Sequence, residues 1–181
     1  MTTTPTPGDF ALTRISGVTG RLISAGQALV GDRAPVQHAY VYVGAGWIVQ
    51  AMPGGAELIP LEAASVPVLW STGLIPLTAA ERIRICGAAR RLVGTPYSFL
   101  DYASIGLAHW HIRPRWLRDY VADSRHLICS QLVDVAYETA GVRLFTDGRI
   151  PGDVTPGDLW RRLQGPRVSS TDRDLWRLAN G

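Results

Sequence analysis

The chain has no lysine. All 18 of its basic side chains are arginines, set against 15 acidic residues, which gives a formal net charge of +3. Two explanations stay open: codon bias in a GC-rich genome, or avoidance of modifiable amines in a translocated protein. The arginines are scattered, and no helix-turn-helix or zinc-finger spacing occurs among the residues, so we expect no nucleic-acid partner.

Cysteine is also scarce. Cys86 and Cys129 cannot build a disulfide framework, and the opening stretch MTTTPTPGDF lacks the basic head and apolar run of a signal peptide. Gly, Pro and Gln interrupt every apolar run before it reaches the roughly 18 residues of a membrane span. We therefore expect free thiols and a cytoplasmic location, with delivery by a phage particle or a dedicated secretion system as the alternative.

Alternating apolar residues predict strands in the first half of the chain. The predicted strands are DFALTRI, QHAYVYVG, GWIVQAM, GAELIPLE and VPVLWSTGLIPL. The linker GAG indicates that the second and third form a hairpin, and we expect the later strands to continue an antiparallel meander.

Helical spacing dominates the second half of the chain. The predicted helices are an early GRLISAGQALVG, followed by LTAAERIRICGAARRLVG, TPYSFLDYASIGL, LICSQLVDVAYETAG and TPGDLWRRLQG. Strands followed by helices indicate an α+β domain, an antiparallel sheet or barrel packed against helices. We expect one domain at 8–165, between a disordered tail at 1–7 and a loosely held tail at 166–181.

Cys129 opens one of these predicted helices. Its apolar face consists of Leu132, Val133, Val135, Ala136 and Ala140. In the first turn, unpaired backbone N–H groups and the positive end of the helix dipole favour a thiolate and can donate to an oxyanion. From the cysteine alone, a nucleophile and a small apolar filler remain equally open. Asp134 lies five residues further on, and we expect it on the solvated helix surface.

A thiolate nucleophile normally needs an imidazole partner. His38 heads the strand QHAYVYVG, in which alternation places His38, Tyr40 and Tyr42 on one face. Gln50 is the single polar residue in GWIVQAM, and a lone amide in an apolar strand needs a hydrogen-bond partner such as the imidazole of His38. That is the role of the third member of an acyl-transfer triad. The alternative is a Gln50 that faces solvent on an edge strand.

Other candidate residues have weaker support. Cys86 lies in mid-helix, where no free backbone amide assists ionisation, and we interpret it as structural. His109 and His111 form an HxH pair without an evident third ligand, so we expect no metal site. His126 is a rival base, three residues before the candidate nucleophile.

The order and spacing of these stretches resemble a known family. They are PGDFALTR, GRLISAG, QHAYVYVG, GWIVQAMPGGAELIPLE, GTPYSFLDY and LICSQLV. Together they are similar to the circularly permuted branch of the papain-like NlpC-type cysteine hydrolases, to which bacterial YiiX-like proteins and the lecithin:retinol acyltransferase-like enzymes belong. The likeness runs from about Gly8 to Trp160. In the unpermuted relatives the cysteine helix comes before the histidine strand, whereas here His38 precedes Cys129.

The resemblance implies a permuted papain-like fold with a catalytic triad. Cys129 is then the nucleophile, His38 the general base and Gln50 the residue that orients His38. Relatives often carry Glu or His at the third position, and a neutral Gln stabilises an imidazolium less than a carboxylate does. No cofactor is implied.

Substrate-binding residues are also suggested. Tyr97, in GTPY, matches a tyrosine that lines the cleft in similar proteins, although packing explains it equally well. Tyr40 and Ser130 are the other substrate-binding candidates. The segment HWHIRPRWLRDY contains Arg113, Arg115 and Trp116, a mixture that suits peripheral contact with a membrane or another anionic surface. Inward packing of its aromatic residues is the alternative.

The function that the resemblance implies is a cysteine hydrolase of the amidase or peptidase type, working through an acyl-enzyme. Its first expected substrate is a peptide of the cell wall, from a bacterial or phage context. A lipid or thioester acyl hydrolase or acyltransferase is one alternative. A non-catalytic binding domain on the same fold is another. The oligomeric state is left open.

Overall fold

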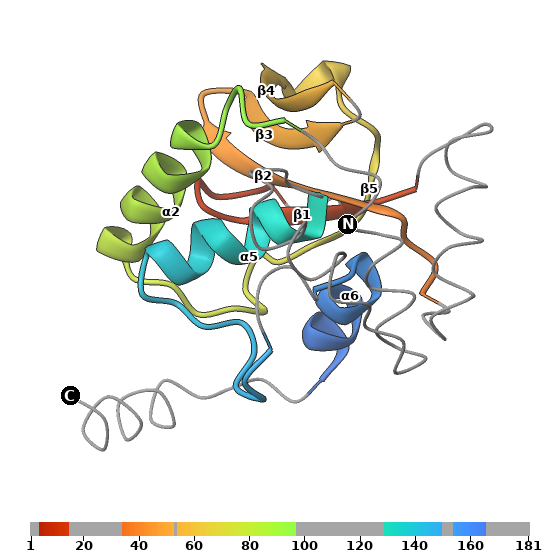
Figure 1. Ribbon diagram of the computed structural model, residues 1–181, viewed down its shortest axis with the longest axis vertical. Helices are drawn as coiled ribbons and strands as arrows, with labels where there is room; N and C mark the ends of the chain where they lie inside the picture. The colour runs from red at the N-terminus through yellow and green to blue at the C-terminus, as the bar shows by residue number, and fades with distance from the viewer. Residues whose placement is uncertain (1–3, 15–33, 53, 97–128, 150–153, 166–181) are drawn as a thin grey trace, which may run out of the picture.

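A computed structural model of the chain describes residues 4–14, 34–52, 54–96, 129–149 and 154–165 (Figure 1). Five strands form one antiparallel sheet: β1 (Phe10–Thr13), β2 (His38–Gly44), β3 (Trp47–Met52), β4 (Gly55–Pro60) and β5 (Pro67–Trp70). The described helices are α2 (Ala79–Arg91), α5 (Cys129–Thr139), α6 (Pro156–Gln164) and the short 3-10 helix η1 (Leu61–Ala63). The predicted α+β class with an antiparallel sheet is confirmed.

The β2–β3 hairpin forms where the GAG linker predicts it. Gly44, Ala45 and Gly46 all have positive φ angles, of 91°, 53° and 76°. Glycine adopts such angles without a steric penalty, which allows the tight reversal. The hairpin register places Tyr40 opposite Gln50 and Val41 opposite Val49, so the residues proposed for the site lie on one face of the sheet.

The predicted meander is wrong for β5. The sheet order is β4-β3-β2-β1-β5, so β5 pairs with β1 at the edge opposite β4. The connection between the two edges crosses the sheet face that carries Tyr40: Leu61 and Ala64 pack over this face, and the Tyr40 hydroxyl donates to the Ser65 carbonyl at 3.1 Å. A crossing segment buries that tyrosine, whereas a continued meander would leave it at the surface.

The opposite face of the sheet supports the main core. Figure 1 shows α2 and α5 side by side against the sheet. Phe10, Val41 and Val49 of the sheet pack there with Ile85 of α2 and Leu132 of α5. Because the cysteine helix is fixed along its apolar face, its first residue is held at a defined place beside the sheet.

Local capping signals specify the helix starts. Thr78 and Glu81 form the predicted capping box of α2, with the Glu81 N–H donating to Thr78 Oγ1 at 3.2 Å. Thr155 and Asp158 form a second capping box at the start of α6. The predicted cysteine helix is described as α5 from Cys129 to Thr139.

Some predicted segments lie outside the described residues. These are GRLISAGQALVG, most of TPYSFLDYASIGL and the 166–181 tail. Residues 4–7 of the predicted N-terminal tail are described, and there the Thr6 N–H donates to Asp9 while the Pro7 carbonyl accepts from Arg82. Among the described helices, none has the length and apolar character needed to cross a membrane.

Candidate active site

Cys129 is the first residue of α5 and is 1% exposed. Its Sγ lies 4.0 Å from the carbonyl oxygen of Gln37, the residue just before β2. The helix therefore brings the thiol to the start of the strand that carries His38. Backbone N–H groups in the first turn of a helix have no partner within it, so this end of α5 favours negative charge on sulfur.

His38, the first residue of β2, meets the thiol there. It is 2% exposed, and hydrogen bonding with the Cys129 thiol is the largest of the influences that raise its pKa. Burial is the largest influence and lowers the pKa of His38. The hydrogen bond and charge of Cys129, the hydrogen bond of Gln50 and the charge of Glu57 outweigh it, so the pKa is raised. These contacts favour an imidazolium beside a thiolate.

Gln50 occupies the position predicted for a residue that orients His38. Its Oε1 lies 2.9 Å from His38 Nε2. Gln50 is buried on β3, a strand paired on both sides by β2 and β4, so the alternative of a solvent-facing residue on an edge strand is wrong. The amide oxygen fixes the Nε2 end of the imidazole ring.

Glu57 is a member of this hydrogen-bonded chain that the sequence interpretation missed. It lies on β4 directly opposite Gln50, and Gln50 Nε2 donates to Glu57 Oε1 at 2.8 Å. The signal that could have found it is the hairpin register, because pairing β3 with β4 places Glu57 across from Gln50. An exposed glutamate in an alternating strand otherwise looks like an ordinary surface residue.

Tyr40 and Ser130, predicted as substrate-binding residues, are fully buried with their hydroxyl groups already engaged. Tyr40 donates to the Ser65 carbonyl and packs edge-on against Trp70. Ser130 donates to the Val154 carbonyl at 2.6 Å, which ties the start of α5 to the segment before α6. Both contacts hold the site in place.

Thr13 also borders the site. It pairs with His38 across β1 and β2, and its Oγ1 is the single buried side-chain polar atom without a hydrogen-bond partner in the described part of the chain. A buried polar group without a partner is unusual in a folded protein.

Several sequence candidates fall outside the described residues. These are Tyr97, His109, His111, Arg113, Arg115, Trp116 and His126. Across the segments that the structure does describe, no group of three or more His, Cys, Asp or Glu side chains could hold a metal ion.

Two further predictions concern residues near the site. Cys86 is half-buried, and its Sγ lies 3.9 Å from the Tyr42 carbonyl. Burial raises the pKa of Cys86, in keeping with a structural thiol. The prediction that Asp134 lies on a solvated surface is wrong, because it is 8% exposed beneath the segment that follows α5.

Comparison of the chain with protein-family models, with characterised proteins and with solved structures finds no match. The geometry of the site is therefore the basis for its chemistry. The site contains three groups that suit acyl transfer. The thiol at the helix N-terminus can serve as the nucleophile, the imidazole beside it can carry a proton, and the amide that contacts the imidazole can orient it.

Proposed function

We propose that the protein is a cysteine hydrolase or acyltransferase that works through a thioester intermediate. The single observation that carries this proposal is the hydrogen-bonded chain from Cys129 through His38 to Gln50. Cys129 is the nucleophile, His38 the general base and acid, and Gln50 the orienting residue. The order of the His38 strand before the Cys129 helix also fits the permuted papain-like fold that the sequence resembles.

In the proposed reaction the Cys129 thiolate attacks a carbonyl carbon, and the electron pair of the C=O bond moves onto oxygen. Backbone N–H groups of the first turn of α5 stabilise that oxyanion. When the intermediate collapses, the leaving amine, alcohol or thiol takes the proton of the His38 imidazolium, and a thioester remains on Cys129. His38 then removes a proton from water or another acceptor, which attacks the thioester. Collapse of the second tetrahedral intermediate breaks the C–S bond and releases the acyl product and the Cys129 thiolate, and the proton that His38 took up restores the thiolate–imidazolium pair.

The family resemblance supplies the proposed substrate class. Cell-wall peptide amides come first, and lipid or thioester acyl groups second. A binding domain that retains the fold without turnover is the rival from another class, and it requires no reactivity of the thiol. The buried hydrogen bond between Cys129 and His38 favours the enzyme, because a mere packing cysteine gains nothing from an imidazole partner.

The first test compares the two cysteines within one molecule. Exposure alone predicts that half-buried Cys86 reacts before Cys129, which is 1% exposed. The proposal predicts the reverse: at about pH 6, Cys129 reacts with iodoacetamide roughly tenfold faster than Cys86, because a thiolate paired with an imidazolium persists well below the pKa of about 8.5 of a free thiol. Peptide mass spectrometry measures both rates.

An activated thioester provides the matching test of turnover. Brief exposure should acylate the wild type and a Cys86→Ala variant equally, and should leave Cys129→Ala unmodified, as read from intact mass. Equal or slower alkylation of Cys129 at every pH, together with no acyl-enzyme, would support the binding-domain alternative.

A further inference from the structure

We propose that Glu57 is a positioning residue for the Cys129–His38 pair. Its carboxylate holds the Gln50 amide in one orientation. The orientation of that amide then determines which nitrogen of the His38 ring is protonated and donates a hydrogen bond to Gln50. The inference rests on the proposed function and adds a fourth member to its hydrogen-bonded chain.

The hydrogen-bonding capacity of each group fixes the donors and acceptors along this chain. A carboxylate only accepts hydrogen bonds, so the contact of 2.8 Å with Glu57 Oε1 must be made by the NH₂ end of Gln50. The carbonyl end then faces His38 Nε2 at 2.9 Å and can only accept. His38 Nε2 therefore donates, and its other nitrogen is left for the Cys129 proton. Without Glu57 the amide is free to turn its NH₂ group toward His38 and to favour the opposite tautomer.

The strand register explains why this carboxylate is in reach. Gln50 pairs with Tyr40 on one side and with Glu57 on the other, so all three side chains share one face. Glu57 is exposed on β4, where a charge remains hydrated, whereas Gln50 is 7% exposed. A carboxylate at the buried position would lose most of its hydration. The site thus keeps a neutral amide inside and its negative charge one residue further out.

The test is the alkylation profile of Cys129 against pH in a Glu57→Gln variant. We expect the rate at about pH 6 to fall by about tenfold, the lower end of the losses of about 10–100-fold found when the outer hydrogen-bond partner of a metal-binding histidine is removed. Glu62→Gln is the matched control, an exposed glutamate on η1 without a bond to the site, and it should keep the wild-type profile. The melting temperature of both variants should stay close to that of the wild type, because both positions are exposed.

A swap of the two side chains separates positioning from general structure. The Gln50→Glu/Glu57→Gln double variant places an acceptor against His38 Nε2 and an amide donor behind it, so low-pH reactivity should return. The Gln50→Glu single variant places two carboxylates opposite each other, so its low-pH alkylation rate of Cys129 should stay below that of the double variant. If wild-type Cys129 has no low-pH reactivity, the proposed function and the role of Glu57 both fail. If the wild type is reactive and Glu57→Gln keeps its profile, only the role of Glu57 is overturned.

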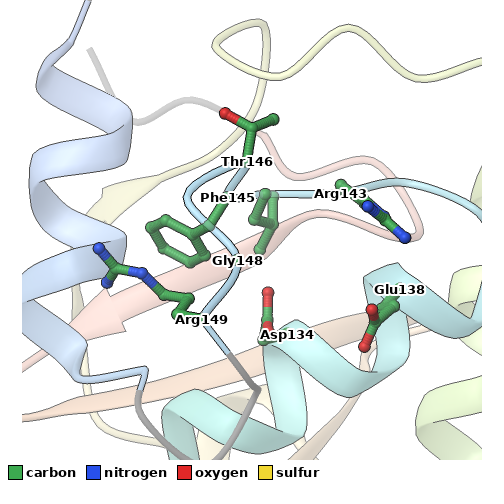
Figure 2. Close-up of a pocket in the computed structure, with 8 residues that line it drawn as sticks. Asp134, Glu138, Arg143, Phe145, Thr146, Gly148 and Arg149 are labelled. Carbon is green, nitrogen blue, oxygen red and sulfur yellow. The ribbon is translucent and has the colours of Figure 1, made fainter. Parts of the chain in front are cut away.

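A second inference comes from a different region. A pocket of about 290 Å³ lies between α5 and the segment from Arg143 to Arg149 (Figure 2). Asp134 points into it from α5, is 8% exposed, and has no hydrogen bond or ion pair with the described residues. Glu138, one helical turn further along α5, also lines the pocket. The Asp134 carboxylate borders the pocket rather than a sealed core, so a cationic group of a ligand can reach it.

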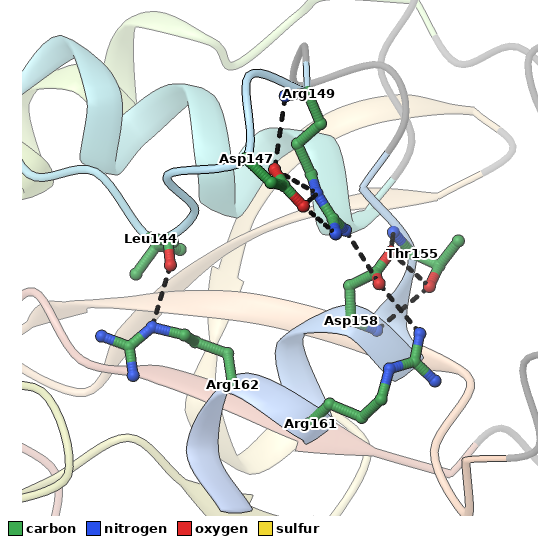
Figure 3. Close-up of polar contacts among 7 residues, drawn as sticks. All are labelled: Leu144, Asp147, Arg149, Thr155, Asp158, Arg161 and Arg162. Atoms are coloured by element: carbon green, nitrogen blue, oxygen red, sulfur yellow. Dashed lines mark hydrogen bonds and ion pairs between the residues drawn. The ribbon is translucent and has the colours of Figure 1, made fainter. Parts of the chain in front are cut away.

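We infer that this pocket binds a small organic ammonium ion. Asp134 and Glu138 supply the negative charge, and Leu144 and Phe145 offer apolar surface for a short alkyl chain. The positive charge of Arg149 does not make the pocket a site for anions, because Asp147 and Asp158 already bind its guanidinium (Figure 3). The same contacts fix the pocket wall against α6.

The charges that face Asp134 set the pH range for the test. Burial is the largest influence and, with the negative charge of Glu138, raises the pKa of Asp134 to about 6; Arg149 opposes this rise and Asp147 adds to it. Arg143 lines the same pocket. The pKa of Asp134 is higher in the folded protein than in the unfolded chain, so the folded protein holds a proton there over a wider pH range. The contribution of Asp134 to the free energy of unfolding therefore falls as the pH rises from about 4 to about 6. An ammonium ligand should therefore bind best above about pH 6, where the carboxylate is ionised.

The probe is n-butylammonium, with n-butanol and butyrate as matched neutral and anionic controls. At about pH 7, millimolar amine should raise the melting temperature of the wild type by a few degrees, and the controls should not. The Asp134→Asn variant should not respond to the amine, and without ligand it should melt above the wild type at this pH but not below about pH 4. Equal responses to amine and butanol, or no response to any of them, would overturn the inference.

Discussion

Replacing His38 by alanine should lower the alkylation rate of Cys129 at about pH 6 by about 100-fold or more, because a thiolate without its imidazolium partner forms near the pKa of about 8.5 of an ordinary thiol. Cys86 in the same molecule should react as before. The His38 ring is the partner of the Cys129 thiol. The raised pKa of His38 is what we expect of an imidazolium that lies beside a thiolate. The measurement is the alkylation rate of each cysteine peptide from acidic to alkaline pH.

The controls for this variant address folding and the rival base. His38 is 2% exposed, so alanine leaves a cavity, and a His38→Gln variant that fills most of the space should show the same loss of low-pH reactivity with a smaller loss of stability. Should His38→Ala keep the wild-type profile, His38 is not the base. His126 would then be the residue to replace.

The local parts of this fold could be predicted from sequence, and the non-local parts could not. The β2–β3 hairpin depends on a three-residue linker, and the α2 capping box on Thr78 and Glu81, which lie three residues apart. The pairing of β5 with β1 depends on how the segment after β4 crosses the Tyr40 face. No short-range pattern encodes that crossing, so the meander prediction failed there.

The candidate site also has features that the sequence predicts and features that it does not. The bond between His38 and Gln50 could be predicted because a hairpin joins their strands and a buried amide needs a partner. The burial of Asp134 could not, since it depends on a segment that returns over α5 after the helix ends. Glu57 was missed for a different reason. It is exposed, and its importance comes only from the side chain opposite it.

Replacing Asp9 by alanine should reduce the free energy of unfolding by about 3–5 kcal/mol, the cost of breaking a buried ion pair by removing one partner. Asp9 is fully buried just before β1. Its carboxylate accepts from Arg82 at 2.8 Å, from the Thr6 N–H at 2.8 Å and from the Thr72 hydroxyl at 2.7 Å. These contacts join the N-terminal segment to α2 and to the turn after β5.

Urea unfolding with an unchanged m-value would measure the loss for Asp9→Ala. Asp147→Ala is the matched control, because Asp147 is a half-exposed aspartate that also pairs with an arginine, and screening by water should make its effect much smaller. An Asp9/Arg82 double-mutant cycle would isolate the pair from the other hydrogen bonds. A loss for Asp9→Ala no larger than that for Asp147→Ala would mean that the network contributes little.

The Asp9 network should also affect the candidate active site. Asp9 precedes the strand whose last residue, Thr13, pairs with His38, and the neighbouring Gly8 carbonyl accepts from Tyr137 of α5 at 2.7 Å. The same short segment therefore contacts the helix that begins with Cys129 and leads into the strand beside His38. A milder Asp9→Asn variant that remains folded should lose part of the low-pH reactivity of Cys129, because small displacements of α5 relative to β2 lengthen the bond between thiol and imidazole. Unchanged reactivity in that variant would show that the site tolerates loosening of its N-terminal support.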